Sequence, residues 1–178
     1  MGRPHRDFDD GTYHVAARAS DDRRLFSTAD DRRVFLARLS ATFRKLDLEL
    51  LTYVLMGTHY HALVRTPDAR LSRALQGLHG GYALHHNRVH GRSAHLFRAH
   101  CVARRIEDDD DFLTTLRYLA LNPVAAGLAS DAFAWAWSSA AAHAGIEPAP
   151  VPLAERRLRD AFGGAPDWRA RYRTFVAV

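Results

Sequence analysis

The chain has 178 residues, of which 47% are hydrophobic and 25% are charged, and this length is typical of one folded domain with a buried core. No segment approaches the roughly 18 to 20 consecutive apolar residues of a membrane helix. We expect no secretory signal, because no apolar stretch follows the first residues. The single cysteine, Cys101, excludes an internal disulfide and a cysteine-based zinc site, and the sequence therefore predicts a cytoplasmic protein.

The charge balance is basic, with a formal net charge of +5 and a pI near 9.9. A basic protein gains free energy by releasing the counterions of a polyanion, so this balance favours a nucleic-acid partner. Lys45 is the only lysine, and alanine is abundant. A GC-rich genome produces the same bias without selection for binding, so the charge alone leaves both interpretations open.

The first quarter of the chain predicts a strand and a helix. Residues 11–19 alternate loosely and form the expected strand. Thr28 is followed three residues later by Asp31, as in a capping box at the start of a helix. Apolar residues then recur at three- and four-residue steps, at Val34, Phe35, Leu39, Phe43 and Leu46.

Two strands are expected next, at 48–56 and 59–65. Only Gly57 and Thr58 separate them, and a glycine in the first position of a two-residue connection is typical of a tight hairpin turn. The two strands should therefore pair antiparallel, and the second one begins at the rim of the sheet.

A second helix is expected from Pro67, although Gly80 and Gly81 weaken its later half. Its apolar stripe is Leu71, Leu75, Leu78 and Tyr82. A fourth strand is expected at 96–104. One face of this strand holds Phe97, Ala99, Cys101 and Ala103, and the other holds Arg98, His100 and Arg104.

This order, βαββαβ, is that of a ferredoxin-like antiparallel sheet, and it predicts an α+β fold. A third helix follows at 110–122, and Pro123 should end it because the residue before a proline avoids helical geometry. We divide the chain into a domain of residues 1–145 and a tail of residues 146–178. The tail consists of a proline-rich linker and short helices around 153–162 and 168–176.

The most informative motif is the pair His59 and His61 in the third strand. Strand side chains alternate between faces, so both imidazoles point the same way and could bind one metal ion. A lone His-x-His in a strand is more often a packing or surface feature, so the pair needs support from other residues.

The third helix supplies that support. Its apolar residues form one stripe, and Tyr118 and Asn122 lie one turn apart almost opposite it. Tyr82, in contrast, continues a core stripe and is expected to be buried. Together with His59 and His61, Tyr118 and Asn122 could form an active site that cleaves phosphodiester bonds. Imidazoles and an amide oxygen would hold a divalent ion, and the phenol would attack phosphorus to give a covalent phosphotyrosine.

At these residues the chain resembles the HUH-type single-tyrosine transposases, in particular the bacterial transposases associated with repetitive extragenic palindromes (REPs). Five ordered blocks carry the resemblance: GTYHV at 11–15, MGTHYHALV at 56–64, HGRSAHLF at 90–97, RYLALNPVAAGL at 117–128 and WSS at 137–139.

The resemblance implies that His59 and His61 bind the metal, Asn122 is the third ligand and Tyr118 is the nucleophile. The family binds single-stranded DNA that forms hairpins. It cleaves with Mg²⁺ or Mn²⁺, leaving a 5′-phosphotyrosine and a free 3′-hydroxyl. The chain departs from the family at Gly57-Thr58, where Pro-Asn is frequent, at His85 and His86, where aromatics are usual, and at 99–102, which lacks a Gly-Arg-Phe-Lys pattern.

Six residues are candidates for DNA contacts: Arg65, Arg88, Arg92, Arg98, His100 and Arg104. His95 is a further possible contact. The histidines at positions 85, 86, 90, 95 and 100 lack a regular ligand spacing, so we interpret them as helix, loop and strand residues. The acidic run 108–111 is interpreted as a helix start, where negative charge is favourable.

Two alternatives stay open. The strand histidines could activate water in a metal-dependent hydrolase, or the fold could bind nucleic acid without cutting it. The sequence does not decide between a monomer and a homodimer.

Overall fold

The computed structural model describes residues 8–20, 23–93, 95–98 and 101–177. Four strands form one antiparallel sheet in the order β2-β3-β1-β4. The strands are β1 (Gly11–Arg18), β2 (Glu49–Leu55), β3 (His59–Thr66) and β4 (Val102–Arg105). The helices are α1 (Ala29–Lys45), α2 (Arg70–Val89), α3 (Asp109–Ala125), α4 (Ala140–His143), α5 (Arg156–Ala161) and α6 (Trp168–Val176). The predicted α+β class and βαββαβ order are confirmed.

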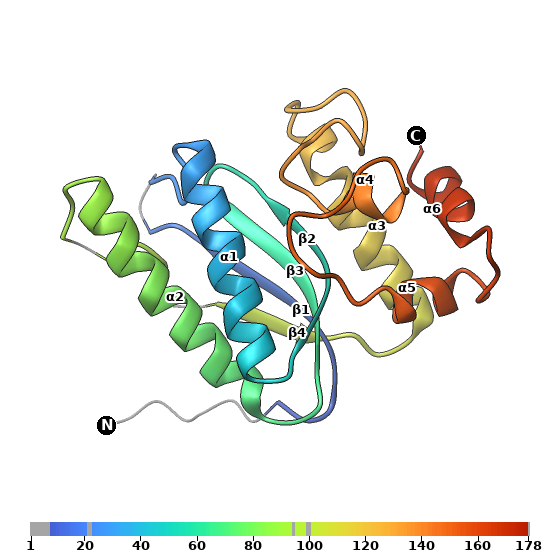
Figure 1. The fold of residues 1–178 in the computed structure, drawn as a ribbon, viewed down its shortest axis with the longest axis horizontal. Coiled ribbons are helices and arrows are strands. Elements are labelled where there is room, and N and C mark those ends of the chain that lie inside the picture. Colours follow the sequence, from blue (N-terminus) through green and yellow to red (C-terminus); the bar gives the residue numbers. More distant parts are fainter. Residues whose placement is uncertain (1–7, 21–22, 94, 99–100, 178) are drawn as a thin grey trace.

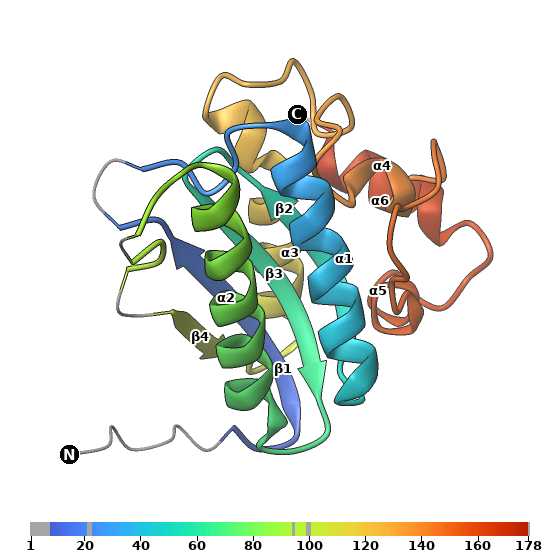
Figure 2. The same cartoon turned by 60° about the vertical axis from the view of Figure 1, so that its left-hand side comes forward.

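The sheet lies between two helical layers (Figures 1 and 2). α1 and α2 lie side by side on one face, and α3 covers part of the other face with α4, α5 and α6 beyond it. Each layer has its own hydrophobic cluster. Tyr60 and Val64 of β3 belong to the α1–α2 cluster, whereas Leu63 belongs to the α3 cluster. The alternation of strand side chains thus separates two cores on either side of one sheet.

The start of α1 confirms the predicted capping box. The Thr28 hydroxyl accepts the Asp31 N–H at 3.1 Å, and the Asp31 carboxylate accepts the Thr28 N–H at 2.8 Å. These bonds satisfy donors that a helix start otherwise leaves unpaired.

The predicted hairpin is also confirmed. The Met56 N–H donates to the His59 carbonyl at 2.9 Å across the Gly57-Thr58 turn, and Leu55 lies opposite Tyr60. This turn places His59 as the first residue of β3, at one end of the sheet.

The prediction that Pro123 ends α3 is wrong, since the helix runs to Ala125. The missing N–H of proline and the clash of its ring affect the turn before it, so the residues after Pro123 can stay helical. The helix then closes around Gly127 at φ 68°, with the Leu128 N–H donating to the Pro123 carbonyl at 2.8 Å. Asn122 therefore stays helical, one turn after Tyr118.

The predicted fourth strand is too long. β4 covers only Val102–Arg105. Before β4, an isolated β-bridge joins Phe97 to Ala19, the residue after β1. Cys101 and Ala103 pack toward the α1–α2 core, as their parity predicts. Ala99 and His100 lie outside the described residues.

The C-terminal helices pack on α3 through Leu158, Trp168, Tyr172 and Val176, all of which are buried. The division of the chain at residue 145 stays a prediction. None of the helices in the described part of the chain is long and apolar enough to cross a membrane.

Candidate active site

Three histidines share the face of the sheet that α3 covers. His59 and His61 come from β3, and His14 comes from the neighbouring strand β1. The His59 and His61 rings lie 5.2 Å apart between centroids. His14 stacks on His61 at 5.1 Å, and its Nε2 lies 3.0 Å from His61 Nδ1, within hydrogen-bond distance.

α3 brings the two predicted polar residues to these imidazoles. The Tyr118 ring meets His61 edge to face at 5.5 Å and His14 at 6.2 Å, and the tyrosine is 50% exposed. The Asn122 side chain hydrogen-bonds the His59 imidazole. The structure therefore brings together all four predicted site residues and leaves the phenol accessible to a substrate.

The imidazoles are held in their neutral form. Burial, followed by the positive charges that His14, His59 and Arg18 can carry, lowers the pKa of His61 to about 3. Burial and Arg18 likewise lower the pKa of His59, against a smaller opposing effect of its bond to Asn122. Neutral imidazoles keep a ring-nitrogen lone pair for a metal ion at neutral pH.

The hydrogen bonds around the strand histidines fit a metal site. Thr58 Oγ1 lies 3.1 Å from His59 Nδ1, and His14 occupies Nδ1 of His61. A protein partner on one ring nitrogen fixes the ring, and for His61 it leaves Nε2 for a metal ion. The Asn122 amide beside His59 supplies a hard oxygen donor, so the predicted donor set suits a small divalent cation.

An open groove runs along α3 beside the site. Its volume is about 630 Å³, and its lining includes Tyr118 and Asn122 together with Leu121 and Phe175. The groove is mainly apolar and gives a path to the phenol from the outer side of α3.

Two of the predicted DNA contacts already have carboxylate partners. Arg104 makes two hydrogen bonds to Asp111, at 2.6 and 2.9 Å. Arg65 lies 3.2 Å from Asp10, at the opposite end of β3 from His59.

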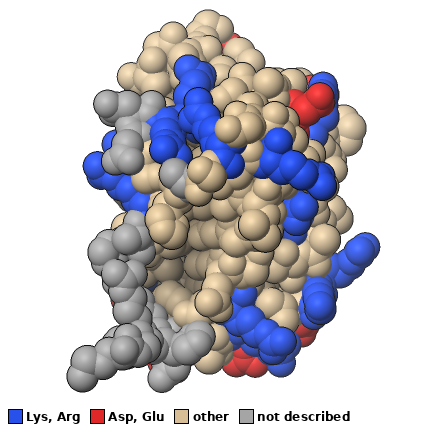
Figure 3. Space-filling view, turned by 90° about the vertical axis from the view of Figure 1, so that its left-hand side faces the viewer, with Lys and Arg blue, Asp and Glu red and all other residues tan. Residues whose placement is uncertain are grey.

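The remaining candidate arginines, Arg88, Arg92 and Arg98, are exposed. On the side of the molecule that carries α2, Figure 3 shows Lys and Arg side chains gathered above and below an uncharged central area. His100 lies outside the described residues. A role of these residues in DNA binding stays a prediction.

His14 was missed by the sequence analysis, although it belongs to the GTYHV block. The signal was present, because the predicted ferredoxin-like order places the first strand beside the third. The parity of β1 puts His14 on the face opposite Tyr13 and Val15, which are core residues.

A second histidine group lies away from this site. Within the described ranges, Asp31, His86 and His90 are the one group of three or more His, Cys, Asp or Glu residues whose ligand atoms could hold a metal ion. The irregular spacing of these histidines had argued against a metal cluster.

No protein-family model matches this chain, and no curated protein matches it. Among solved structures, the REP-associated tyrosine transposase bound to a REP hairpin is similar, with a TM-score of 0.67 over 86% of this chain and 92% of that one. The sequence identity is 16%. The chain therefore has the fold of this REP-associated tyrosine transposase, as its sequence motifs predicted.

Proposed function

We propose that the protein is a metal-dependent endonuclease and strand transferase, a transposase that acts on hairpin-forming single-stranded DNA. One observation supports this most strongly. The half-exposed Tyr118 lies against the imidazoles of His61 and His14 instead of in the core. A phenol in that place has no packing role and can reach a substrate.

Tyr118 is the nucleophile in this proposal. Its Oη forms a bond to the scissile phosphorus while the bond from phosphorus to the 3′ oxygen breaks. The phenol loses its proton to solvent and the 3′ oxygen takes one up, which leaves a 5′-phosphotyrosine and a free 3′-hydroxyl. The intermediate keeps the energy of the phosphodiester, so a second strand can be joined later.

His59, His61 and Asn122 would hold Mg²⁺ or Mn²⁺. Such an ion supplies Lewis-acid polarisation of the scissile phosphate. His14 keeps the His61 ring in place through its hydrogen bond, and Thr58 does the same for His59. The two rings then stay aligned before substrate arrives, which reduces the reorganisation needed for catalysis.

The proposed substrate follows from two independent observations. The structurally similar transposase is bound to a REP hairpin. The chain also has a formal net charge of +5 and exposed arginines at positions 88, 92 and 98. These positive charges would contact phosphates, and they would position the DNA without reading its sequence.

The decisive experiment incubates the protein with Mn²⁺ and an end-labelled hairpin in single-stranded DNA, and then separates the products under denaturing conditions. We expect a covalent protein–DNA band that Tyr118→Phe abolishes while hairpin binding persists. Tyr13→Phe is the matched control, because it removes a phenol hydroxyl that contacts the Asp9 carbonyl in the opposite core.

Three outcomes would contradict the proposal. A band that persists in Tyr118→Phe would exclude this nucleophile. Nicking without a covalent band would favour a hydrolase that activates water. Hairpin binding without any metal-dependent nicking would favour a non-catalytic binding module. His59→Ala should also lose the band, together with a loss of Mn²⁺ binding measured without DNA.

A further inference from the structure

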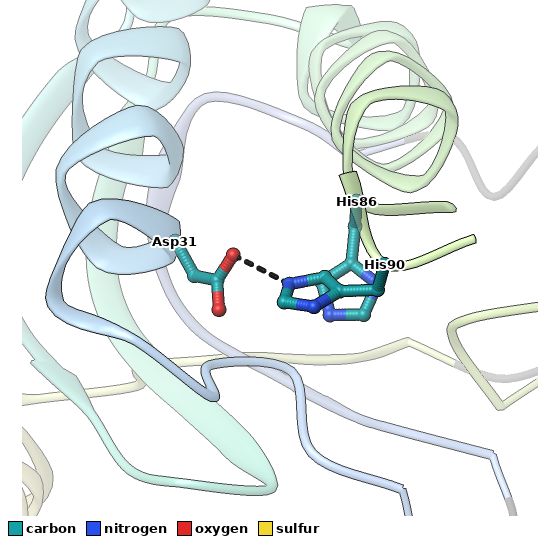
Figure 4. A group of neighbouring side chains, drawn as sticks. All are labelled: Asp31, His86 and His90. Carbon is teal, nitrogen blue, oxygen red and sulfur yellow. Dashed lines mark hydrogen bonds and ion pairs between the residues drawn. The ribbon is translucent and has the colours of Figure 1, made fainter. Parts of the chain in front are cut away.

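The group Asp31, His86 and His90 joins the two helices on the other side of the sheet from Tyr118. Asp31 lies in the first turn of α1, and the two histidines lie one turn apart at the end of α2. Figure 4 shows the Asp31 carboxylate facing the two imidazoles, which overlap in this view. One ligand atom from each residue lies within 4.8 Å of the others.

The Asp31 carboxylate is held in a fixed position by the helix cap. Its Oδ2 accepts the backbone N–H groups of Ser27 and Thr28, both at 2.8 Å. Its Oδ1 points to His90 Nε2 at 2.9 Å, and only 3% of the side chain is exposed. One oxygen therefore serves the helix cap, and the other is left for the imidazoles.

His86 is the unexplained member of this group. Its side chain is buried, with 1% of the residue exposed, and neither ring nitrogen has a hydrogen-bond partner. Its ring lies 4.2 Å from that of His90. A buried polar group without a partner is costly to the folded state, so such a group calls for a ligand that the protein atoms do not provide.

We propose that Asp31, His86 and His90 form a second metal site that binds Zn²⁺. Two imidazoles and one buried carboxylate oxygen are ligands that zinc commonly takes in proteins. Water would complete the tetrahedral coordination.

Zinc bound at this site would stabilise the fold by linking two helices. The metal ion would cross-link the start of α1 to the end of α2, which are far apart in sequence. The segment before α1 also contacts the β2–β3 turn, since the Phe26 N–H donates to the Gly57 carbonyl at 3.1 Å. Zinc would therefore stabilise the helical layer and the turn that precedes His59.

The test uses the full chain with both His59→Ala and His61→Ala, so that the site under α3 cannot contribute. The apoprotein is titrated with Zn²⁺ against a chromophoric chelator, and with Co²⁺ to follow visible absorption. We expect one tight equivalent of Zn²⁺, a tetrahedral Co²⁺ spectrum, and a Tm that rises with added Zn²⁺.

In this background, His90→Ala and His86→Ala should each abolish the tight equivalent and the Tm rise. His90→Ala is the more informative variant, because His90 is only partly buried and its loss should disturb the core less than the loss of the buried His86. His85→Ala is the matched control, since it removes the adjacent histidine of α2 and should leave zinc binding unchanged.

Tight zinc binding that survives in both His86→Ala and His90→Ala would overturn the proposal. So would the absence of tight binding in the double variant, which would leave the Asp31–His90 contact as an ordinary hydrogen bond. Because the strand histidines are absent from the test, neither result depends on the proposed DNA chemistry.

Discussion

At the start of β3, the two faces of the strand differ in chemical character. Tyr60 and Val64 point toward α1 and α2 and are fully buried. His59 and His61 point toward α3 and remain partly exposed. At residues 59–61 the alternation thus places a core side chain on one face and the candidate site on the other, whereas Leu63, further along the α3 face, is buried in the second core. Residues next to each other in sequence should therefore respond very differently to substitution.

The largest contrast is expected between two tyrosines. Tyr60→Ala should lower the free energy of unfolding by about 3–5 kcal/mol, because it empties a closed core site, whereas Tyr118→Ala should change it by less than about 0.5 kcal/mol. Tyr60 also loses a 2.7 Å hydrogen bond to His79. Urea denaturation of both variants measures the difference, and equal losses would show that Tyr118 has a packing role.

The next effect concerns His14, which we regard as a positioning residue. His14→Ala removes the partner of His61 Nδ1 and should weaken Mn²⁺ binding about 10- to 100-fold, as for other residues that orient a metal ligand. Isothermal titration without DNA measures this, and His14→Gln should recover part of the affinity. Thr12→Ala, on the same face of β1, is the control. Unchanged Mn²⁺ affinity in His14→Ala would exclude a positioning role.

The fold was predictable where a local rule decides the structure. The capping box at Thr28, the Gly57-Thr58 turn and strand alternation each involve residues close together in sequence. The contact between His59 and Asn122 was predictable only because strand alternation indicated His59 and the four-residue spacing of a helix indicated Asn122. The length of β4 was not predictable, because the extent of a strand depends on pairing with another strand, and the local sequence does not determine that pairing.

The proposed metal site of Asp31, His86 and His90 was not predictable from the sequence, for a different reason. His86 and His90 are one helical turn apart, but their third partner is in another helix more than fifty positions away in the chain. Asp31 was correctly interpreted as a capping residue, and that role used only one of its oxygens. Sequence spacing cannot reveal such a group, because tertiary packing of α1 on α2 creates it.

A smaller effect is expected from pH. Burial lowers the pKa of His61 from 6.5 to about 3 in the folded state. As pH falls below 6.5, the unfolded chain therefore binds a proton that the folded protein excludes, and the free energy of unfolding decreases until the pH approaches 3.

Urea denaturation between pH 7.5 and pH 5 tests this, with His61→Ala as the control that should show a shallower decline. His79 on the other face contributes in the same direction, since burial lowers its pKa to about 4. An imidazole NMR signal of His61 that titrates near 6.5 would contradict the expected burial of this ring.

The smallest expected effect distinguishes two arginines near the fourth strand. Arg98 is exposed, and the backbone of β1 holds its position through the Arg98 N–H, which donates to the Arg18 carbonyl at 2.9 Å. If its guanidinium contacts phosphate, Arg98→Ala should weaken hairpin binding regardless of sequence and reduce the slope of log K against log salt by about 0.7 to 0.9. Arg104 is already bound to Asp111 by two hydrogen bonds, so Arg104→Ala should change the slope less.

Fluorescence anisotropy over a salt series measures both slopes. A larger change for Arg104 would mean that DNA displaces Asp111, and it would place the nucleic acid along β4 beside His14, whose position in β1 lies opposite Arg104.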